Sequence, residues 1–414
     1  MDRCAAQHNS TADQPDTARN VGHAPGTFGP GTFERRSARR VLLVTAGVGA
    51  GHNAVARALY DGMLDRWPSI EAQIVDVLES APAFFRAVLL GGHVQGMTRA
   101  PWLYGRFYRA ADRGRVGAFG IGERLRNRIV GRALRHLILL AREFRPDFIL
   151  HMHWCGISAL ARPEACETLC DEQAVVVTDV LAHRYWYSPH IRRWFVAAPE
   201  ALEKFRAWGV GDESVTISGI PVHRRWDDFP PADRVRFEWA LPPEGPLVLV
   251  SGGASFTVGR IGMLARDIRA ACPGAAVVVL CGTNGALRDE LEALPGAGTS
   301  LFAIPFTDRA HELVSAATLF VTKPGGVTTA ECLAAGTPMV LLPPVPCQEG
   351  ENAAWLEQHG AAVVARRQRD VVWHVTRLLQ NEHARAELAA SARALYQPGR
   401  EIVLDFVGER LGLG

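Results

Sequence analysis

The chain has 414 residues, of which 48% are hydrophobic and 21% charged, and its formal net charge is +2. Since this length exceeds the usual size of one hydrophobic core, we expect two domains, and no run approaches the roughly 18 apolar residues of a membrane-spanning helix. The eight cysteines include no C-x-x-C pair, which excludes a disulfide framework and favours reduced thiols in a cytosolic protein.

Residues 1–38 differ in composition from the rest of the chain. They are rich in Ala, Gly, Pro, Asn, Asp and Thr and have almost no apolar periodicity, which predicts a disordered tail. A secretory signal is excluded because no apolar core is present, and the acidic residues argue against a transit peptide.

From residue 39 onward, short apolar runs alternate with segments of helical length and period. The runs expected to be strands are 41–46, 72–77, 148–150, 174–179 and 194–198 and, after a hinge at 218–223, 246–253, 276–282, 300–306, 318–323 and 338–344. This alternation predicts parallel sheets with helices on both faces. The expected fold class is α/β, with two Rossmann-like, doubly wound domains at 39–222 and 223–383, followed by helices at 384–414 that pack back toward the first domain.

The first expected strand leads into a Gly-rich loop, residues 47–52, at the start of a helix. Such a loop lets a ligand approach the backbone where the helix start favours negative charge. A nicotinamide-dinucleotide site is the structural rival, and Asp76 at the end of the next strand suits its ribose-binding acid. However, His52 stands where the G-x-G-x-x-G pattern of such a site needs a third glycine.

His52 is the candidate catalytic residue. An imidazole at the carboxyl edge of a parallel sheet lies where ligands bind in open α/β folds, and it can accept a proton from a hydroxyl near neutral pH. The alternative is a histidine at a helix start that forms only local hydrogen bonds. Its neighbours Gly49, Gly51 and Asn53 form the candidate acceptor loop.

The second expected domain carries the more specific signal, residues 322–338. A strand end is followed there by a Pro-Gly-Gly turn and a short helix, so that Gly325 and Gly326 can expose consecutive backbone N–H groups suited to a diphosphate without a metal. One turn into the helix, Glu331 is placed to accept both hydroxyls of a ribose, unless it is a solvated acid on the helix face.

Two further loops complete the expected donor site. Gly252 and Gly253 follow the first strand of the second domain and precede a helix, as the first Gly-rich loop does. Prolines stiffen the later loop 343–352, which supplies amide and carboxylate groups suited to sugar hydroxyls from Gln348, Glu349 and Asn352.

Together these motifs resemble those of the monogalactosyldiacylglycerol synthase and processive diacylglycerol glucosyltransferase family, which is related more distantly to the peptidoglycan lipid-intermediate transferase. The matching segments keep their order along the chain and cover residues 47–52, 178–186, 218–222, 323–331 and 344–352. The resemblance implies a GT-B fold, in which two Rossmann-like domains face an interdomain cleft. The second domain would hold a UDP-sugar and the first an acceptor lipid.

The resemblance also implies a role for each matching residue. Gly325, Gly326 and Thr328 would contact the diphosphate, Glu331 the ribose, Phe306 the uracil, and Gln348 with Glu349 the hexose, while His52 would be the general base. Two departures leave the identity of the hexose open. Cys347 stands where many relatives have glycine, and Arg184 and Tyr185 stand beside His183.

The implied activity is inverting transfer of galactose or glucose from a UDP-sugar to diacylglycerol or a related membrane lipid, which forms a β-glycolipid. No cofactor and no catalytic metal are expected, because the helix start would stabilise the leaving diphosphate. Two alternatives stay open: N-acetylglucosaminyl transfer to a polyprenyl-diphosphate cell-wall intermediate, and a non-catalytic sugar-nucleotide-binding protein. The sequence does not assign an oligomeric state.

Residues 99–145 form a basic segment with twelve arginines and three acids, so its net charge is 12 − 3 = +9. On a helical wheel, Arg124, Arg128, Arg132, Arg135 and Arg142 share one face, opposite Ile129, Val130, Ala133, Leu134, Leu137 and Ala141. Aromatic residues alternate with arginines at 101–109. We expect peripheral contact with an anionic membrane surface on the cytoplasmic side rather than with nucleic acid, since no nucleic-acid motif accompanies the charge; the alternative is a solvated helix face.

Overall fold

The computed structural model describes residues 38–47, 50–79, 81–87, 89, 106, 112, 121–161, 169–253, 260–345 and 347–413. These residues belong to one compact unit that begins at Ala38. The predicted tail lies outside the described residues, apart from Ala38 itself.

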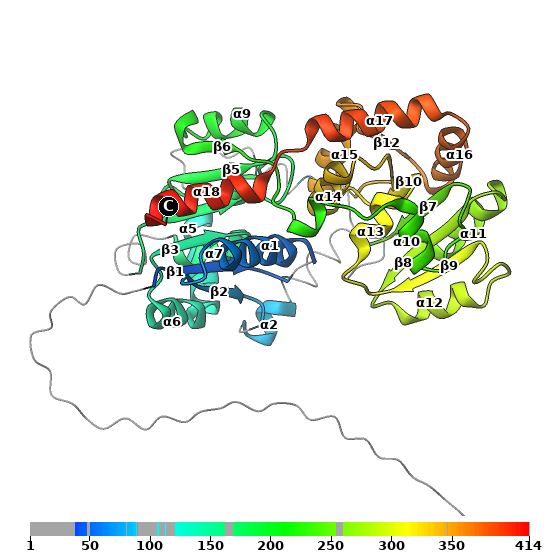
Figure 1. Ribbon diagram of the computed structural model, residues 1–414. Helices are drawn as coiled ribbons and strands as arrows, with labels where there is room; N and C mark the ends of the chain where they lie inside the picture. Colours follow the sequence, from blue (N-terminus) through cyan, green and yellow to red (C-terminus); the bar gives the residue numbers. More distant parts are fainter. Residues whose placement is uncertain are drawn as a thin grey trace, which may run out of the picture. The chain divides into compact units, whose positions relative to one another are not determined.

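Within the described residues, the first half of this unit is built on a sheet of six parallel strands in the order β2-β1-β3-β4-β5-β6 (Figure 1). The strands are β1 (Arg40–Thr45), β2 (Glu71–Asp76), β3 (Phe148–His151), β4 (Gln173–Val176), β5 (Arg193–Val196) and β6 (Val215–Ile217). In register, Val41 of β1 pairs with Ala72 of β2 and with Phe148 of β3. The apolar runs therefore predicted β1 to β5 correctly, and β6 was missed because a polar residue, Thr216, interrupts its short sequence.

The second half repeats this architecture with a second sheet of described parallel strands, in the order β12-β11-β10-β7-β8-β9. They are β7 (Leu247–Ser251), β8 (Ala276–Gly282), β9 (Leu301–Pro305), β10 (Leu319–Thr322), β11 (Met339–Leu341) and β12 (Ala362–Val364). The order places β7 beside β10, which is the arrangement of a doubly wound dinucleotide-binding sheet. The predicted α/β class with two doubly wound sheets is confirmed.

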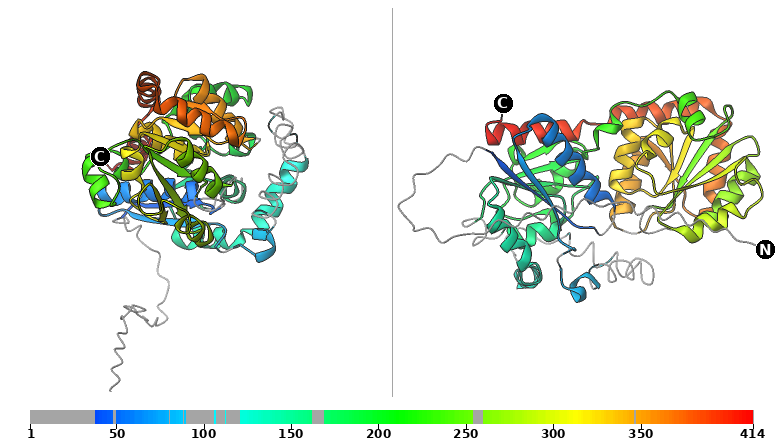
Figure 2. Two further views of the ribbon diagram at one scale, coloured as in Figure 1. Left: turned by 90° about the vertical axis from the view of Figure 1, so that its right-hand side faces the viewer. Right: turned by 60° about the horizontal axis from the view of Figure 1, so that its bottom comes forward.

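Helices cover both faces of each sheet (Figures 1 and 2). Beside the first sheet lie α1 (Ala50–Arg66), α2 (Ala83–Arg86), α5 (Ile121–Ala133), α6 (Arg135–Phe144), α7 (Trp154–Leu160) and α9 (Glu200–Ala207). Beside the second lie α10 (Ala232–Glu238), α11 (Ile261–Ala271), α12 (Gly285–Glu292), α13 (Ala310–Ala316), α14 (Gly326–Ala335), α15 (Gln348–Gln358), α16 (Gln368–Leu379) and α17 (Glu382–Leu395). No described helix is long and apolar enough to cross a bilayer.

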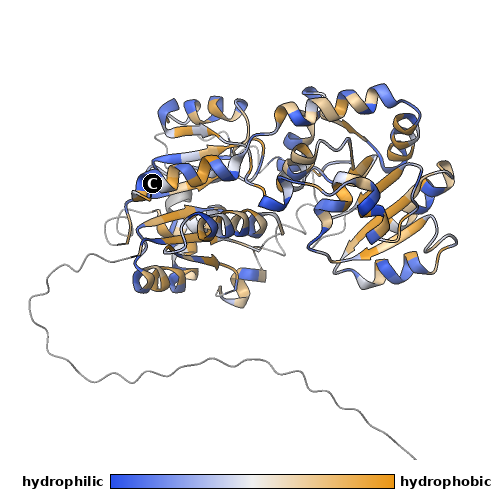
Figure 3. Ribbon diagram, in the orientation of Figure 1, coloured by the Kyte–Doolittle hydropathy of each residue, from blue (hydrophilic) through white to orange (hydrophobic). Residues whose placement is uncertain are grey.

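The strands are apolar on both faces because each face is covered. In β1, Val41 and Leu43 pack with Val55 and Leu59 of α1, while the alternate residues, including Leu42, pack with α5 and α6 on the other face. Side chains of a strand point to opposite faces in turn, so a doubly covered strand has no polar stripe. In Figure 3 the strands are mostly coloured as hydrophobic, whereas the helices, which have one face in solvent, are of mixed colour.

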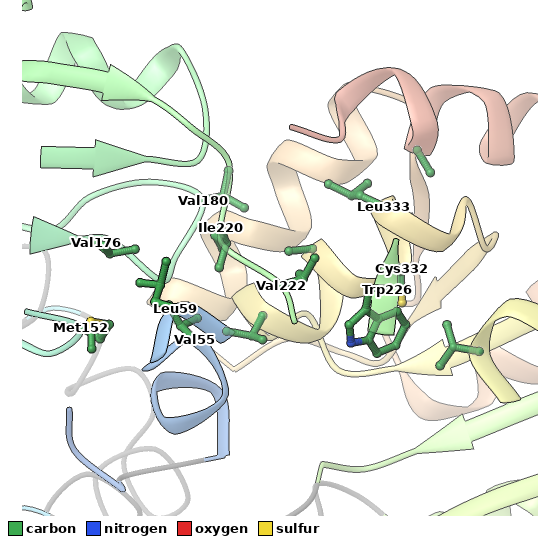
Figure 4. Close-up of a cluster of buried hydrophobic side chains, with 14 of the residues drawn as sticks. Val55, Leu59, Met152, Val176, Val180, Ile220, Val222, Trp226, Cys332 and Leu333 are labelled. Atoms are coloured by element: carbon green, nitrogen blue, oxygen red, sulfur yellow. The ribbon is translucent and has the colours of Figure 1, made fainter. Parts of the chain in front are cut away.

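One buried cluster runs from the first half into the second. Figure 4 shows side chains of α1, of the segment after β6 and of α14 that gather in it, among them Val55, Leu59, Ile220, Val222, Trp226, Cys332 and Leu333. The predicted hinge at 218–223 is therefore packed against both halves rather than exposed to solvent. This packing fixes the start of α1 beside α14.

The expected C-terminal helices divide between the halves. α17 packs on α14, whereas α18 (Gly399–Leu411) packs on α1. The Phe406 ring of α18 lies 6.2 Å from that of Phe148 and 5.4 Å from that of Phe195, between ring centroids. The chain thus crosses back to the first sheet after the second is complete.

Candidate active site

The carboxyl edges of both sheets carry the Gly-rich loops. Open α/β sheets bind ligands where the strand order reverses. In the first sheet this point lies between β1 and β3, and β1 leads into the loop 47–52. In the second sheet it lies between β7 and β10, followed by Gly252 and Gly253 and by the Lys323–Gly325 loop. The predicted loops therefore lie at the two expected ligand positions.

His52 lies in the first turn of α1 and is partly exposed. Its Nδ1 is 2.9 Å from the hydroxyl oxygen of Thr178, a residue that follows β4. Its ring centroid is 4.9 Å from that of His153 in an edge-on contact and 6.3 Å from that of Trp186. The hydrogen bond and the aromatic neighbours fix the orientation of the imidazole.

Asp76 supports the first Gly-rich loop. Its carboxylate accepts hydrogen bonds from the backbone N–H of Gly47 at 3.0 Å, from the Asn53 amide at 3.1 Å and from the backbone N–H of Leu78 at 2.9 Å. The Asn53 amide oxygen in turn accepts from the Thr45 hydroxyl at 2.8 Å. In a nicotinamide-dinucleotide site, Asp76 would bind the ribose. Because its carboxylate is already occupied by these contacts, the main support for a nicotinamide-dinucleotide site is lost.

Of the other two residues of the predicted acceptor loop, the structure describes Gly51. Gly51 faces α14, and a Cβ atom at this position would lie 3.2 Å from Cγ2 of Val327. Gly49 lies outside the described residues. Gly51 therefore allows the close approach of two helices, one from each half.

Gly326 makes a close backbone contact between the halves. A Cβ atom here would lie 2.1 Å from the Thr178 carbonyl oxygen and 3.2 Å from Cα of Asp179. No side chain could be accommodated without moving one backbone away from the other. Because Thr178 also bonds to His52, this contact brings the candidate base to the start of α14.

The start of α14 has the character of an anion site. Gly325 is its N-cap residue and provides no capping side chain, and its own N–H donates to the Lys323 carbonyl at 2.9 Å. The N–H groups of the first turn, which begins at Gly326 and includes the partly exposed Thr328, have no partners inside the helix. They add to the positive end of the helix dipole, which suits a diphosphate.

The loop after β7 lies at the same edge of the second sheet as the loop after β10. Gly253, in this loop, adopts a φ of 102°. Its N–H donates to the Ser251 hydroxyl at 3.2 Å. This conformation is one that glycine tolerates and other residues rarely adopt. Gly252 and Gly253 therefore form a tight turn at this edge, and residues 254–259 beyond it are outside the described residues.

Arg225 lies near both the turn of Phe306 and the carboxyl group of Glu331. Phe306 follows β9 and is 67% exposed. The Arg225 guanidinium donates to the carbonyl of Asp308 in the same turn, and its charge also acts on Glu331. Arg225 was not predicted, since nothing in the sequence distinguishes it from the adjacent Arg224.

Glu331 is not a solvated acid. Although it keeps some exposed surface, the surrounding protein desolvates its carboxyl group and raises the pKa to about 8, and the positive charge of Arg225 opposes this shift. A carboxylate in this setting gains from hydroxyl donors that compensate its lost hydration.

Gln348 and Glu349 begin α15, next to the Gly-rich loop of α14. The Glu349 carboxylate accepts from the Lys323 ammonium at 3.1 Å. Cys347, the N-cap residue, has a φ of 94° and a ψ of −133°, a region that favours glycine. This backbone geometry is one that glycine would adopt with less strain than cysteine.

Asn352 lies in a different environment from the other predicted sugar ligands. It is 1% exposed, and its amide bonds to the backbone N–H of Val180 and to the carbonyl of Pro324, each at 3.0 Å. Asn352 is therefore buried, whereas Gln348 and Glu349 are partly exposed.

Asp179 is a titratable group that sequence reasoning did not single out. Burial raises its pKa to about 7; a hydrogen bond with Asn352 opposes the shift, and the charges of Glu351 and Glu349 add to it. Lys204 lies nearby and bridges Asp112 at 3.1 Å and Glu351 at 3.5 Å. These residues come from distant segments, so only the fold brings them together.

The described part of the basic segment is two helices, α5 and α6, rather than one. Arg128, Arg132, Arg135 and Arg142 are exposed, and Val130, Leu134, Leu137 and Ala141 are buried, as expected. Ile129 was expected on the buried face but is 55% exposed, and Leu125 and Leu139 are also exposed. Leu134 lies between the two helices with a φ of −100° and a ψ of 26°, so a single helical wheel does not describe both. The side chain of Arg124 and the segment 101–109, except Arg106, lie outside the described residues.

The described residues contain no group of three or more His, Cys, Asp or Glu side chains that could hold a metal ion. The cysteines that the structure describes form no disulfide.

Comparison with known proteins identifies both halves. Residues 52–222 match the family described as monogalactosyldiacylglycerol (MGDG) synthase, and residues 247–398 match the glycosyltransferase family 28 C-terminal domain. The processive diacylglycerol beta-glucosyltransferase of Bacillus subtilis (strain 168) is 27% identical over 370 residues, which are 89% of this chain and 94% of the relative. The protein of the same name from Staphylococcus carnosus is 30% identical over 269 residues, 63% of this chain and 66% of the relative.

Among solved structures, MurG of Acinetobacter baumannii has the same fold. It superposes with a TM-score of 0.55 at 16% identity and covers 90% of this chain and 99% of its own. Both sheets, their order and the paired loops are those of a GT-B protein. The chain belongs to the monogalactosyldiacylglycerol synthase and processive diacylglycerol glucosyltransferase family.

Proposed function

We propose that this protein is an inverting glycosyltransferase that transfers a hexose from a UDP-sugar to diacylglycerol or a related membrane lipid and forms a β-glycolipid. The observation that carries the proposal is the contact of Gly326 with Thr178, which brings the candidate base His52 to the helix start that suits a diphosphate. The names of its relatives favour glucose as the hexose and diacylglycerol as the acceptor.

The donor is held by the second half. Phe306 stacks on the uracil, and Glu331 accepts hydrogen bonds from the ribose hydroxyls. The diphosphate lies at the first turn of α14, against Gly325, Gly326 and Thr328 and facing the turn of Gly252 and Gly253. Gln348 and Glu349 bind the hexose. The exposed Phe306 ring and the desolvated Glu331 carboxyl support this placement, because both gain contacts when a nucleotide binds.

His52 acts as the general base. Nδ1 is hydrogen-bonded to the Thr178 hydroxyl. In the tautomer that the mechanism requires, Nδ1–H donates to this hydroxyl, and the Nε2 lone pair accepts the proton of the acceptor hydroxyl. The acceptor oxygen then forms a bond to the anomeric carbon as the bond to the UDP oxygen breaks on the opposite face. One such displacement inverts the configuration and gives a β-linkage. The start of α14 stabilises the charge that develops on the leaving diphosphate.

A panel of sugar nucleotides and acceptors tests the function. We expect transfer from UDP-glucose to diacylglycerol to exceed transfer from UDP-galactose and UDP-N-acetylglucosamine, and the product to be the β-anomer by NMR. A chelator should leave the rate unchanged, since helix N–H groups take the role of a metal. Transfer of N-acetylglucosamine to a polyprenyl diphosphate would replace the proposal with its alternative, and UDP binding without transfer to any acceptor would favour a non-catalytic role.

Replacing the base tests the mechanism. His52→Ala should lower kcat by at least about 100-fold, because general-base catalysis typically contributes that much or more. Binding of UDP, measured by calorimetry, should change by less than about threefold, since His52 does not hold the donor. His383→Ala, at an exposed histidine on α17, is the matched control. Turnover of His52→Ala close to that of the wild type would remove the assignment.

The raised pKa of Glu331 predicts that its charged form lowers the stability of the folded protein and strengthens the binding of UDP. The folded pKa of about 8 exceeds the ordinary value of 4.5. The folded state therefore holds the proton more tightly than the unfolded state, and wild-type stability falls as pH rises from about 4.5 to about 8. Glu331→Gln has no such loss, so its melting temperature should exceed that of the wild type increasingly across this window.

The same variant should bind UDP at least about tenfold more weakly at pH 8, because hydrogen bonds to a charged acceptor contribute more than neutral ones. Thermal unfolding at pH 5, 6.5 and 8 and calorimetry with UDP are the measurements. Glu409→Gln, at an exposed acid of α18, is the control. A melting-temperature difference that does not vary with pH would contradict the burial of this carboxyl group.

We further propose that the protein acts at the cytoplasmic face of the membrane as a peripheral protein. The exposed arginines of α5 and α6 lie among the exposed Leu125, Ile129 and Leu139. Arginines attract anionic head groups, and apolar side chains between them enter the interface.

Flotation with vesicles tests this surface. Binding to vesicles with anionic lipid should exceed binding to neutral vesicles. Changing Arg128, Arg132 and Arg135 together to Glu should weaken it by at least about tenfold, since each basic residue contributes about 1 kcal/mol near a charged surface. The control changes three exposed arginines of the second half, Arg266, Arg288 and Arg369, to Glu. Equal binding of wild type to both kinds of vesicle would overturn the electrostatic contact.

A further inference from the structure

Asn352 connects the two candidate halves of the active site. From α15, its amide oxygen accepts the backbone N–H of Val180, and its amide nitrogen donates to the carbonyl of Pro324, each at 3.0 Å. Its side chain also lies near the Asp179 carboxyl group and favours the charged form of that acid. The residue is 1% exposed, so these contacts are not shared with solvent.

Each end of this bridge reaches a segment that has a role in the proposed reaction. Val180 is two residues after Thr178, whose hydroxyl bonds to His52. Pro324 is two residues before Gly326, where α14 begins. The amide therefore lies between the segment that orients the base and the loop that presents N–H groups to the diphosphate.

The two segments also touch directly, at the close approach of Gly326 to the Thr178 carbonyl. That contact is steric and prevents the segments from moving closer, but it does not prevent them from separating. The Asn352 amide supplies the complementary restraint, because separation would leave a buried donor and a buried acceptor without partners.

The side chain at this position must both donate and accept. An aspartate could still accept from Val180 but could not donate to the Pro324 carbonyl while ionised, and it would place a second carboxylate beside Asp179. The charged groups already around Asp179 are Glu349, Glu351 and Lys204. The asparagine amide satisfies both backbone partners, one with its oxygen and one with its nitrogen.

We propose that Asn352 is a positioning residue that couples the donor loop at Pro324–Gly326 to the Thr178–Val180 segment, and through it to His52. This inference rests on the proposed function and replaces the expectation that Asn352 binds a sugar hydroxyl. Binding of a diphosphate at α14 then also restrains the segment that orients the base.

Steady-state kinetics of Asn352→Ala and Asn352→Asp test the coupling. Both should lower kcat by about 30-fold or more, since misplacing reacting groups by about 1 Å can cost 100-fold. The dissociation constant of UDP should change by less than about threefold, because the uracil and ribose contacts remain. Asn381→Ala, which removes the N-cap of α17, is the control for loss of a structural asparagine and should keep kcat within about twofold.

Hydrogen exchange gives a readout that does not depend on transfer. In the wild type, UDP should slow amide exchange at 325–328 and also at 178–183. In Asn352→Ala the effect at 325–328 should persist and that at 178–183 should be lost. A kcat near the wild-type value in the folded variants, or UDP-dependent protection of 178–183 that survives the substitution, would overturn the proposal.

Two outcomes separate this inference from the proposed function. If no acceptor is glycosylated by the wild type, the function fails while the exchange experiment still decides the coupling. If neither Asn352 variant folds, the wild type alone is decisive, because UDP that protects 325–328 but not 178–183 would refute the coupling.

Discussion

The contact between Gly326 and the Thr178 carbonyl is the constraint on which the site depends. It lets the first turn of α14 lie against the end of the first sheet without an intervening side chain. Gly51, facing Val327 on the same helix, allows a second close approach. The candidate base held by one sheet and the candidate anion site held by the other thereby meet, although no single domain contains both. The shared buried cluster around Ile220 and Trp226 keeps them in place.

This arrangement places ionisable groups where water is scarce. Burial raises the pKa values of both Glu331 and Asp179, which disfavours their charged forms in the folded protein. Such groups destabilise the folded protein and are retained where a ligand compensates the cost. In the proposed reaction the ribose hydroxyls compensate Glu331, while Asn352 already does so in part for Asp179. In the proposed reaction, groups that recognise the nucleotide therefore lower the stability of the free protein.

Much of the fold could be predicted because short apolar runs mark strands buried on both faces. The short strands β6 and β12 were missed, whereas β11, which is equally short, was predicted because it lies inside the longer apolar run 338–344. The Gly-rich loops could be predicted because closely spaced glycines directly after a strand are typical of a ligand-binding turn. The role of Asn352 could not be read, as Val180 lies 172 residues away in sequence and Pro324 lies 28 residues away. Nor could that of Arg225, whose partners are set by tertiary packing. Gly326 was predicted as a phosphate ligand, and its contact with Thr178 adds a steric reason for glycine.

The central claim is that a UDP diphosphate at the start of α14 lies beside a base held by the first sheet. A crystal structure of the protein with UDP bound tests this most directly. The account predicts phosphate oxygens within hydrogen-bond distance of the N–H groups of the first turn of α14, the ribose on Glu331, and the His52 ring still bonded to Thr178 and facing the β-phosphate. A nucleotide bound at the first sheet's Gly-rich loop, or a His52 ring turned away from the phosphates, would contradict it.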